Sequence, residues 1–257
     1  MDLRFNISLA EGYKSGSQIA RVLTEDWLAR NMYCPVCGKN RIRKAEPNAP
    51  VKDYVCESCY SQYELKSQRS VSDVFPKSVA DGVYATMISR ITSLDNPSFF
   101  FMHYDRYEVN NLIIVPKCFF TPEIIFKRKP LPDTARRAGW EGCNILLGNI
   151  PNLAKIAVVR NGEPRRVEDV VKEYNRVYAL QTETLEGRGW LVDVLHCVER
   201  LGHNFTLNQM YAFTEELSAR HPGNKFIQAK IRQQLQILRD KGIIEFQGRG
   251  QYNKVLQ

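Results

Sequence analysis

The sequence lacks any apolar run near the roughly 18 residues that a membrane-spanning helix needs. Its opening segment, MDLRFNISLAEGYK, has no basic stretch followed by an apolar core, so no secretory signal is expected. Internal repeats and low-complexity segments are also absent, which excludes a solenoid or a disordered array. With 44% hydrophobic residues, the chain is predicted to be a packed, cytoplasmic globular protein that does not bind membranes.

A strong charge excess is missing as well. The 36 basic and 28 acidic residues give a formal net charge of +8, and the excess is spread thinly along the chain. One local concentration, opposed only by Asp133, consists of Lys127, Arg128, Lys129, Arg136 and Arg137. Such a balance suits a polyanionic partner without identifying one, and a basic run of this kind is more often a solvated surface than a phosphate contact.

Paired cysteines give the first specific signal. Seven cysteines in a cytoplasmic chain do not indicate a disulfide framework, and the odd number leaves one unpaired. Four of them form two C-x2-C pairs separated by 18 residues: Cys34, Cys37, Cys56 and Cys59. This spacing predicts a structural Zn²⁺ site, closed to water by four thiolates, although buried or redox cysteines are the alternative. Cys118, Cys143 and Cys197 lack partners at ligand spacing and are interpreted as core residues.

The first two thirds of the chain mix helical and strand-like patterns. Helices are predicted at Ser17–Asn31, Val79–Thr92 and Val167–Val177. Strands are predicted in the runs VKDYVC and QYELKS, and at Phe99–Tyr104, Leu112–Val115 and Lys155–Val159. The segment 130–142 is expected to be a loop. This alternation indicates an α/β (α+β) core.

The pattern changes near the C-terminus. Three helices are predicted at Trp190–Leu201, Leu207–Arg220 and Phe226–Lys241, followed by the strand–turn–strand segment IIEFQGRGQYNKV. This succession is typical of a winged helix. The polar stretch Gln181–Gly189 is interpreted as the linker, so the predicted domains are 1–182 and 183–257.

Three residues near the second cysteine pair have the composition of a hard-cation site. Glu64 and Lys66 lie two apart in a predicted strand, so their side chains share one face, and Asp53 lies on the preceding strand. Two carboxylates beside a lysine suit Mg²⁺ and the hydrolysis of a phosphate ester. The spacing alone is common in proteins, and an exposed charged strand edge is the alternative.

With these residues identified, the chain resembles the PD-(D/E)XK nucleases, and in particular the methyl-directed restriction endonucleases of the DpnI type. The resembling segments span nearly the whole chain: YKSGSQIARVLTEDW, YCPVCG, ELKS, DGVYATM, PDTARRAGWEGCNI and RQQLQILRDKGIIEFQGRG. The fold implied is a PD-(D/E)XK nuclease core with an embedded four-cysteine zinc site, followed by a winged helix.

The resemblance implies a Mg²⁺-dependent enzyme that cuts double-stranded DNA at GATC sites carrying N6-methyladenine. The chain is expected to be a monomer in solution. It implies that Asp53, Glu64 and Lys66 are catalytic, and that Leu65 joins the two carboxylates in binding Mg²⁺. Trp140, in the segment ARRAGW, matches a tryptophan expected in the methyl-reading part of the catalytic domain. Core packing is the alternative role of Trp140.

The last predicted helix is a candidate reader of DNA bases. Its apolar residues fall on one face, and the opposite face carries Gln228, Arg232, Gln233 and Gln236. Glutamine can bond adenine and arginine can bond guanine, which suits a GATC site. Lys225, Lys230 and Arg249 are assigned to phosphates, which position a protein on DNA without reading its sequence. A merely solvated helix face is the alternative.

Two other functions remain open from the residues. A zinc-containing winged-helix transcription regulator explains the cysteines, the charge and the C-terminus, but gives no role to the carboxylate–lysine motif. A structure-specific repair nuclease or junction resolvase explains that motif, but needs no base-reading helix.

Overall fold

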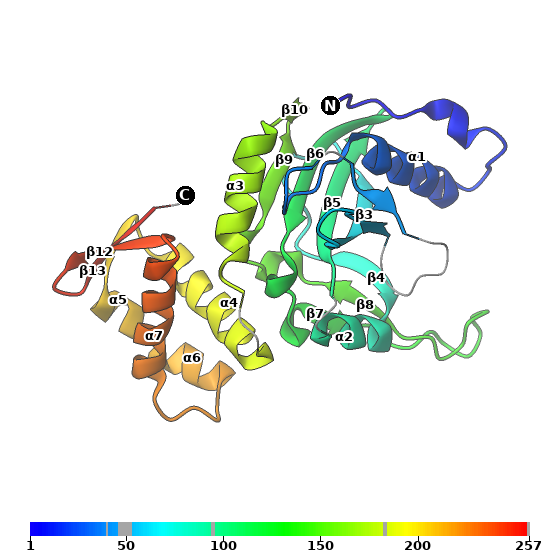
Figure 1. The fold of residues 1–257 in the computed structure, drawn as a ribbon. Helices are drawn as coiled ribbons and strands as arrows, with labels where there is room; N and C mark the ends of the chain where they lie inside the picture. Colours follow the sequence, from blue (N-terminus) through cyan, green and yellow to red (C-terminus); the bar gives the residue numbers. More distant parts are fainter. Residues whose placement is uncertain (40, 46–52, 94–95, 182–183, 256–257) are drawn as a thin grey trace. The chain divides into compact units, whose positions relative to one another are not determined.

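The computed structural model describes residues 1–39, 41–45, 53–93, 96–181 and 184–255. The chain divides into two compact units, one of Met1–Ile150 with Ala154–Asn175, the other of Pro151–Leu153 with Arg176–Gln257. Residues 182 and 183, between which the sequence places the domain boundary, lie outside the described residues. Each unit is described by itself (Figure 1).

The first unit is built on a seven-stranded sheet with the order β1-β2-β3-β5-β6-β9-β10. Its strands are β1 (Arg43–Lys44), β2 (Tyr54–Val55), β3 (Gln62–Arg69), β5 (Ser98–Asp105), β6 (Glu108–Val115), β9 (Ile156–Arg160) and β10 (Glu163–Pro164). A smaller sheet, β4-β8-β7, consists of β4 (Val79–Val83), β8 (Gly142–Ile145) and β7 (Ile125–Lys127). Short 3-10 helices occupy Ile7–Ala10, Lys117–Phe119, Pro122–Ile124, Leu147–Asn149 and Asn152–Ala154.

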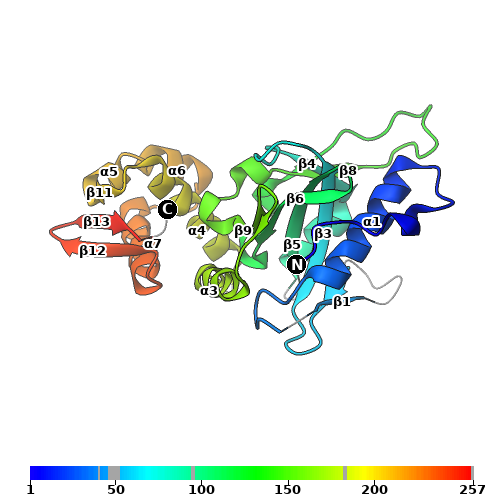
Figure 2. The same ribbon diagram turned by 90° about the horizontal axis from the view of Figure 1, so that it is seen from above.

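Three α-helices accompany these sheets: α1 (Gly16–Asn31), α2 (Tyr84–Thr92) and α3 (Val167–Tyr178). Figure 2 shows α1 lying along the large sheet beside β3, where the hydroxyl oxygens of Thr24 and Ser67 are 3.1 Å apart. Helix α2 packs on the small sheet. Helix α3 reaches the beginning of β5, where the hydroxyls of Tyr174 and Ser98 are 2.8 Å apart.

The centre of the large sheet is the core of the first unit. Residues 98–103 of β5 are all buried, as are residues 111–115 of β6. The phenylalanines among them, Phe99, Phe100 and Phe101, are at most 1% exposed. Burial of both sheet faces explains why these strands are continuous apolar runs and why their positions could be predicted.

Strand β3 occupies a distinctive place in this sheet. It pairs antiparallel with β2 on one side and parallel with β5 on the other, with Glu64 opposite Phe99 and Lys66 opposite Phe101. The β3–β5 connection passes through β4 and α2. The pairing with β5 along residues 63–69 fixes the direction of the β3 side chains, because it holds the backbone of this strand in the extended conformation.

The second unit contains four helices among its described residues, α4 (Leu185–Arg200), α5 (Leu207–Tyr211), α6 (Thr214–Arg220) and α7 (Ile227–Asp240). Its three-stranded sheet has the order β11-β13-β12, from β11 (Asn204–Thr206), β13 (Gln251–Lys254) and β12 (Ile244–Gly248). The buried residues of α7 include Ile227, Ile231, Leu235 and Leu238, the predicted apolar face. The wing turns at Gly248, Arg249 and Gly250, which all have positive φ.

Three sequence predictions about these elements were wrong in detail. The predicted helix Val79–Thr92 begins as strand β4, because residues 79–83 pair with β8 and the helix starts only at Tyr84. The predicted helix Leu207–Arg220 is interrupted near Phe213, where the Thr214 hydroxyl donates to the Tyr211 carbonyl at 2.6 Å. The predicted linker Gln181–Gly189 is helical from Leu185, and the Thr184 side chain accepts a hydrogen bond from the Gly187 N–H.

Among the described residues, no helix combines the length and the hydropathy needed to cross a bilayer.

Candidate active site

The carboxylate–lysine motif gathers around β3. Lys66 Nζ lies 2.5 Å from Glu64 Oε1, as expected for residues two apart on one face of a strand. Asp53 immediately precedes β2, and its N–H donates to the Tyr63 carbonyl at 3.1 Å. Its carboxylate accepts a hydrogen bond of 2.9 Å from the Leu65 N–H. These contacts place Asp53 beside the motif, although the turn with the second cysteine pair separates it from Glu64 in the sequence.

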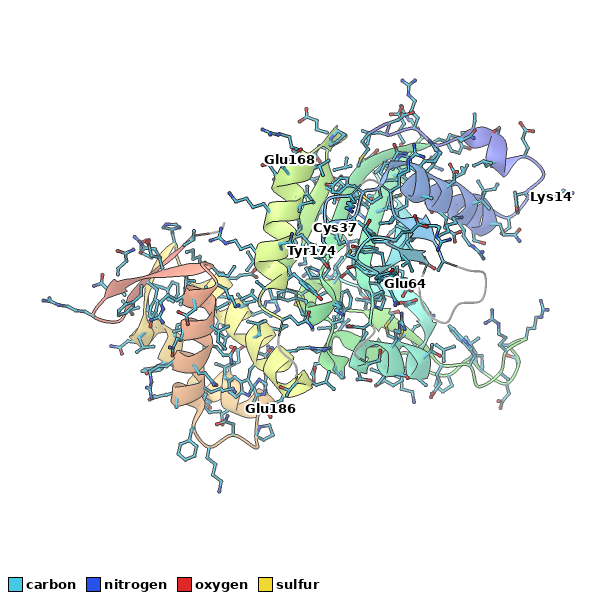
Figure 3. The ribbon with its side chains drawn as sticks, viewed as in Figure 1. Lys14, Cys37, Glu64, Glu168, Tyr174 and Glu186 are labelled. Atoms are coloured by element: carbon cyan, nitrogen blue, oxygen red, sulfur yellow. The ribbon has the colours of Figure 1, made fainter. Side chains whose placement is uncertain are left out.

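Figure 3 labels Glu64 on this part of the sheet. The side chains of Glu64 and Lys66 are only 12% and 17% exposed. Burial, reinforced by the carboxylates of Asp81 and Asp53, raises the pKa of Glu64 to about 7 despite the opposing charge of Lys66. Burial also raises the pKa of Asp53. Burial alone would lower the pKa of Lys66, but the carboxylates of Glu64 and Asp81 raise it above its ordinary value.

Two carboxylate oxygens in this cluster lack a hydrogen-bond partner among the described residues. Glu64 Oε2 and Asp81 Oδ2 are buried and have no hydrogen-bond partner in the described part of the chain. Unsatisfied buried oxygens are unusual and indicate a missing partner such as an ion or a water. Asp53 and Glu64 offer carboxylate oxygens to a cation, and Leu65 could contribute only its main-chain carbonyl. This donor set fits Mg²⁺, which prefers oxygen ligands.

The four predicted zinc ligands form a compact cluster. The sulfur atoms of Cys34, Cys37, Cys56 and Cys59 all lie within 4.8 Å of one another. Cys34 Sγ is 3.5 Å from Cys59 Sγ, and Cys37 Sγ is 3.7 Å from Cys56 Sγ. Zinc–sulfur bonds of about 2.3 Å in a tetrahedron place the sulfurs about 3.8 Å apart, so the cluster fits a zinc ion.

Two knuckles of similar geometry present these thiolates. The Gly38 N–H donates to the Cys34 carbonyl at 2.8 Å, and the Tyr60 N–H donates to the Cys56 carbonyl at the same distance. Gly38 and Tyr60 both have positive φ, which glycine adopts without strain and tyrosine rarely adopts. The second knuckle leads directly from β2 into β3, so the cluster fixes the turn between Asp53 and Glu64.

Trp140 lies in the chain segment between β7 and β8. Its ring packs on Gly142, where an added Cβ would come within 2.6 Å of the ring. The Arg137 guanidinium lies 5.6 Å from the ring centroid. The Leu131 N–H donates to the Trp140 carbonyl at 3.0 Å, which closes the segment into an arm. Trp140 is half-buried against its own segment, so it is not one of the fully buried core residues.

The predicted base readers share the outer face of α7. Gln228, Gln233 and Gln236 are exposed there. Arg232 is also exposed, and its guanidinium donates to the Tyr211 hydroxyl at 2.5 Å. Of the predicted phosphate contacts, Lys225 and Arg249 are exposed and Lys230 is half-buried. Lys230 Nζ lies 5.9 Å from the Trp190 ring centroid.

Comparison with known protein families agrees with this arrangement. The family model described as the Dam-replacing family, DpnI, matches residues 1–183. A second model, the Dam-replacing HTH domain, matches residues 186–254. The chain belongs to the DpnI family. Membership of this family implies a restriction nuclease, and the helix-turn-helix (HTH) domain indicates DNA binding. The predicted mixed α/β core with a four-cysteine cluster, followed by an HTH domain with a small sheet, is confirmed.

Two residues of this DpnI-family chain were missed by the sequence analysis. Asp81 contacts Lys66, with 2.5 Å between Asp81 Oδ1 and Lys66 Nζ. The sequence assigned Asp81 to a helix, and only the pairing of β4 with β8 brings it to β3. Phe226 is 76% exposed just before α7. It borders a hollow of about 370 Å³ that Lys225, Gln228 and Arg232 also line.

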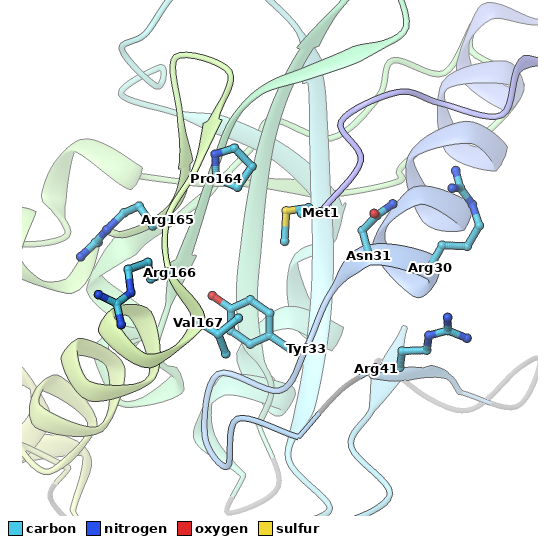
Figure 4. Close-up of a pocket in the computed structure, with 9 residues that line it drawn as sticks. All are labelled: Met1, Arg30, Asn31, Tyr33, Arg41, Pro164, Arg165, Arg166 and Val167. Carbon is cyan, nitrogen blue, oxygen red and sulfur yellow. The ribbon is translucent and has the colours of Figure 1, made fainter.

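A larger hollow in the first unit does not have the character of an anion site. It has a volume of about 420 Å³ and contains four arginines among its lining residues. The guanidinium groups of Arg30 and Arg165 point away from one another in Figure 4. Arg30 is paired with Asp26 at 2.6 Å and Arg165 with Glu173 at 2.7 Å. Because two of the four guanidinium groups are already paired with carboxylates, the cluster on β3 remains the stronger candidate.

Proposed function

We propose that the protein is a Mg²⁺-dependent restriction endonuclease that hydrolyses double-stranded DNA at GATC sites carrying N6-methyladenine. The observation that carries this proposal is the buried cluster of Asp53, Glu64 and Lys66, with its unsatisfied carboxylate oxygen on Glu64. Burying several like charges costs free energy, so a protein retains such a cluster where it serves chemistry. Structural zinc binding alone gives no reason for it.

Asp53, Glu64 and Lys66 would have different roles in hydrolysis. Asp53, held by the Leu65 N–H, and Glu64 would bind the cation. When bound, Mg²⁺ polarises the scissile phosphate and lowers the pKa of a coordinated water. The Lys66 ammonium lies close enough to Glu64 to orient that water and to offset the negative charge that develops on the phosphate. Protons are expected to compete with the cation for the Glu64 carboxylate, because burial raises the pKa of this group to about 7.

Methyl discrimination needs more than one contact. Burial of one methyl group contributes ~0.8 kcal/mol, or roughly fourfold in affinity. A palindrome methylated on both strands and contacted by two domains offers several such contacts. Trp140 in the catalytic domain supplies an aromatic wall. The exposed face of α7 supplies glutamines that can bond adenine, with the exposed ring of Phe226 next to it.

The deciding experiment compares GATC-containing plasmids that are methylated and unmethylated on adenine, incubated with the full chain and Mg²⁺. We expect cleavage of the methylated plasmid alone. A transcription regulator would cut neither plasmid. A repair nuclease or resolvase would cut branched DNA whatever its methylation. Equal cleavage of the two plasmids would leave a nuclease and remove the proposed methyl specificity.

Helix α7 is proposed to contact the base edges of the DNA. Gln233 is exposed on α7, and replacing it with alanine in the full chain should cost ~1–3 kcal/mol in binding to methylated GATC and relax base preference. Lys225→Ala should weaken binding to all sequences alike, because a phosphate contact carries no sequence information. Titration of matched duplexes with and without a GATC site measures both effects. Lys241→Ala, at the far end of α7, is the control.

Lys241→Ala should leave binding to both duplexes unchanged. If Gln233→Ala instead weakens binding to both duplexes by the same factor, α7 anchors the protein on DNA and does not read its bases. Arg232 is a less clean test, because its guanidinium also donates to Tyr211 within the domain.

A further inference from the structure

A third carboxylate reaches the catalytic cluster from a different sheet. Asp81 lies on β4, opposite Cys143 of β8, and its side chain is 9% exposed. Asp81 Oδ1 lies 2.5 Å from Lys66 Nζ and accepts a 2.6 Å hydrogen bond from the Gly82 N–H. The Lys66 ammonium is therefore held between Glu64 of the large sheet and Asp81 of the small sheet.

We propose that Asp81 is a positioning residue of the nuclease site, which anchors the Lys66 ammonium when Glu64 turns its carboxylate to the catalytic cation. This inference rests on the proposed function. It assigns Asp81 a role that neither the sequence motif nor the family comparison gives it. Asp81 acts through Lys66 and need not touch the DNA or the reacting phosphate.

The charges of the cluster support this division of roles. Asp53, Glu64 and Asp81 bring three carboxyl groups to the single ammonium of Lys66, so the acidic groups outnumber the positive charge that the cluster itself supplies. If the Glu64 carboxylate binds the cation, the buried Lys66 ammonium would lose most of its electrostatic stabilisation unless a second anion lay beside it. Asp81 provides that second anion at hydrogen-bond distance.

The contacts of the cluster argue against a purely structural ion pair. A buried pair that served stability alone would have its remaining polar atoms satisfied, because each unsatisfied one costs free energy. Glu64 Oε2 and Asp81 Oδ2 are instead both buried without a partner in the described part of the chain. The Gly82 N–H also donates a hydrogen bond to Asp81 Oδ1, which restricts the movement of this carboxylate and lets it anchor Lys66.

Asp81→Asn in the full chain tests the proposal, because the amide keeps the size of the side chain and an oxygen for Gly82 while removing the charge. The single-turnover rate on methylated DNA should fall by roughly 10–100-fold, as found for residues that orient an active-site group. DNA affinity and the Mg²⁺ concentration that gives half-maximal rate should not change. Asp81→Glu should restore part of the rate.

A second measurement needs neither Mg²⁺ nor turnover. Lys66 should react faster with an amine-acylating reagent in Asp81→Asn than in wild type, as measured by peptide mass spectrometry. Asp105→Asn is the matched control, because Asp105 is paired with Arg69 at 3.0 Å instead of with Lys66. Its cleavage rate and Lys66 labelling should both equal those of wild type.

The outcomes separate the inference from the function on which it rests. If wild type does not cleave methylated DNA, the proposed function fails whatever Asp81 does. If wild type cleaves and Asp81→Asn cleaves equally fast, the positioning role is overturned. The same holds if the reagent acylates Lys66 no faster in Asp81→Asn than in wild type. A lost rate that extra Mg²⁺ restores would make Asp81 a cation ligand and would also overturn it.

Discussion

Asp53→Ala and Lys66→Ala are each expected to abolish cleavage of methylated DNA while sequence-specific binding stays largely intact. Asp53 would hold the cation and Lys66 would act on the water and the phosphate, so neither group faces the edges of the bases. A loss of roughly 10²–10³-fold or more is expected for a group that stabilises developing charge. Plasmid cleavage and duplex titration, performed on the same preparations, measure the two properties separately.

The control for this pair is Glu168→Ala, which removes a charge from the exposed beginning of α3. Glu168 is labelled in Figure 3, on a different element from Glu64. Its variant should cleave at the wild-type rate. Near-normal nicking by both Asp53→Ala and Lys66→Ala would remove the active site from β3.

Cys56→Ser is expected to release zinc and to abolish activity, although Cys56 would touch neither the DNA nor the catalytic cation. Cys56 follows Asp53 by three residues and begins the knuckle that leads into β3. Without the ion, the knuckle no longer fixes Asp53 against Leu65, and structural zinc sites contribute directly to folding. Elemental analysis of freshly purified protein should find one zinc per wild-type chain and less in the variant.

Cys197→Ser is the matched thiol control, because Cys197 is buried in α4 and lies in the other unit. That variant should keep its zinc. Wild-type protein without stoichiometric zinc would contradict the assignment. Chelation is a poor substitute for these variants, because a chelator would also remove the proposed Mg²⁺.

Local patterns were sufficient for much of this molecule. The cysteine spacing predicted a cluster that the structure assembles, since each C-x2-C pair forms its own knuckle. The alternation in β3 placed Glu64 and Lys66 on one face. The apolar face of α7 was predicted from its helical spacing. These features depend on neighbours within one element, which sequence periodicity records directly.

Features that depend on distant pairing were not predicted. The segment 79–83 has a helix directly after it, and only its pairing with residues 142–145 makes it a strand. Asp81 was therefore assigned to a helix and its approach to Lys66 went unseen. The roles of Asp53, Glu64, Lys66 and the reading face remain predictions, because geometry brings residues together without measuring what they do.

The parallel pairing of β3 with β5 has a consequence for the order of events during synthesis. Asp53, Glu64, Lys66 and Asp81 have all been translated by residue 81, but β3 obtains its second neighbour only from residues 98–105. Domains fold as their sequence emerges, and pairing between distant segments waits for the chain that provides it. A ribosome-bound chain that ends before β5 thus contains all four of these residues but lacks the strand that pairs with β3 along residues 63–69. We therefore expect the arrangement of Glu64 and Lys66 to form only after residues 98–105 have joined the sheet.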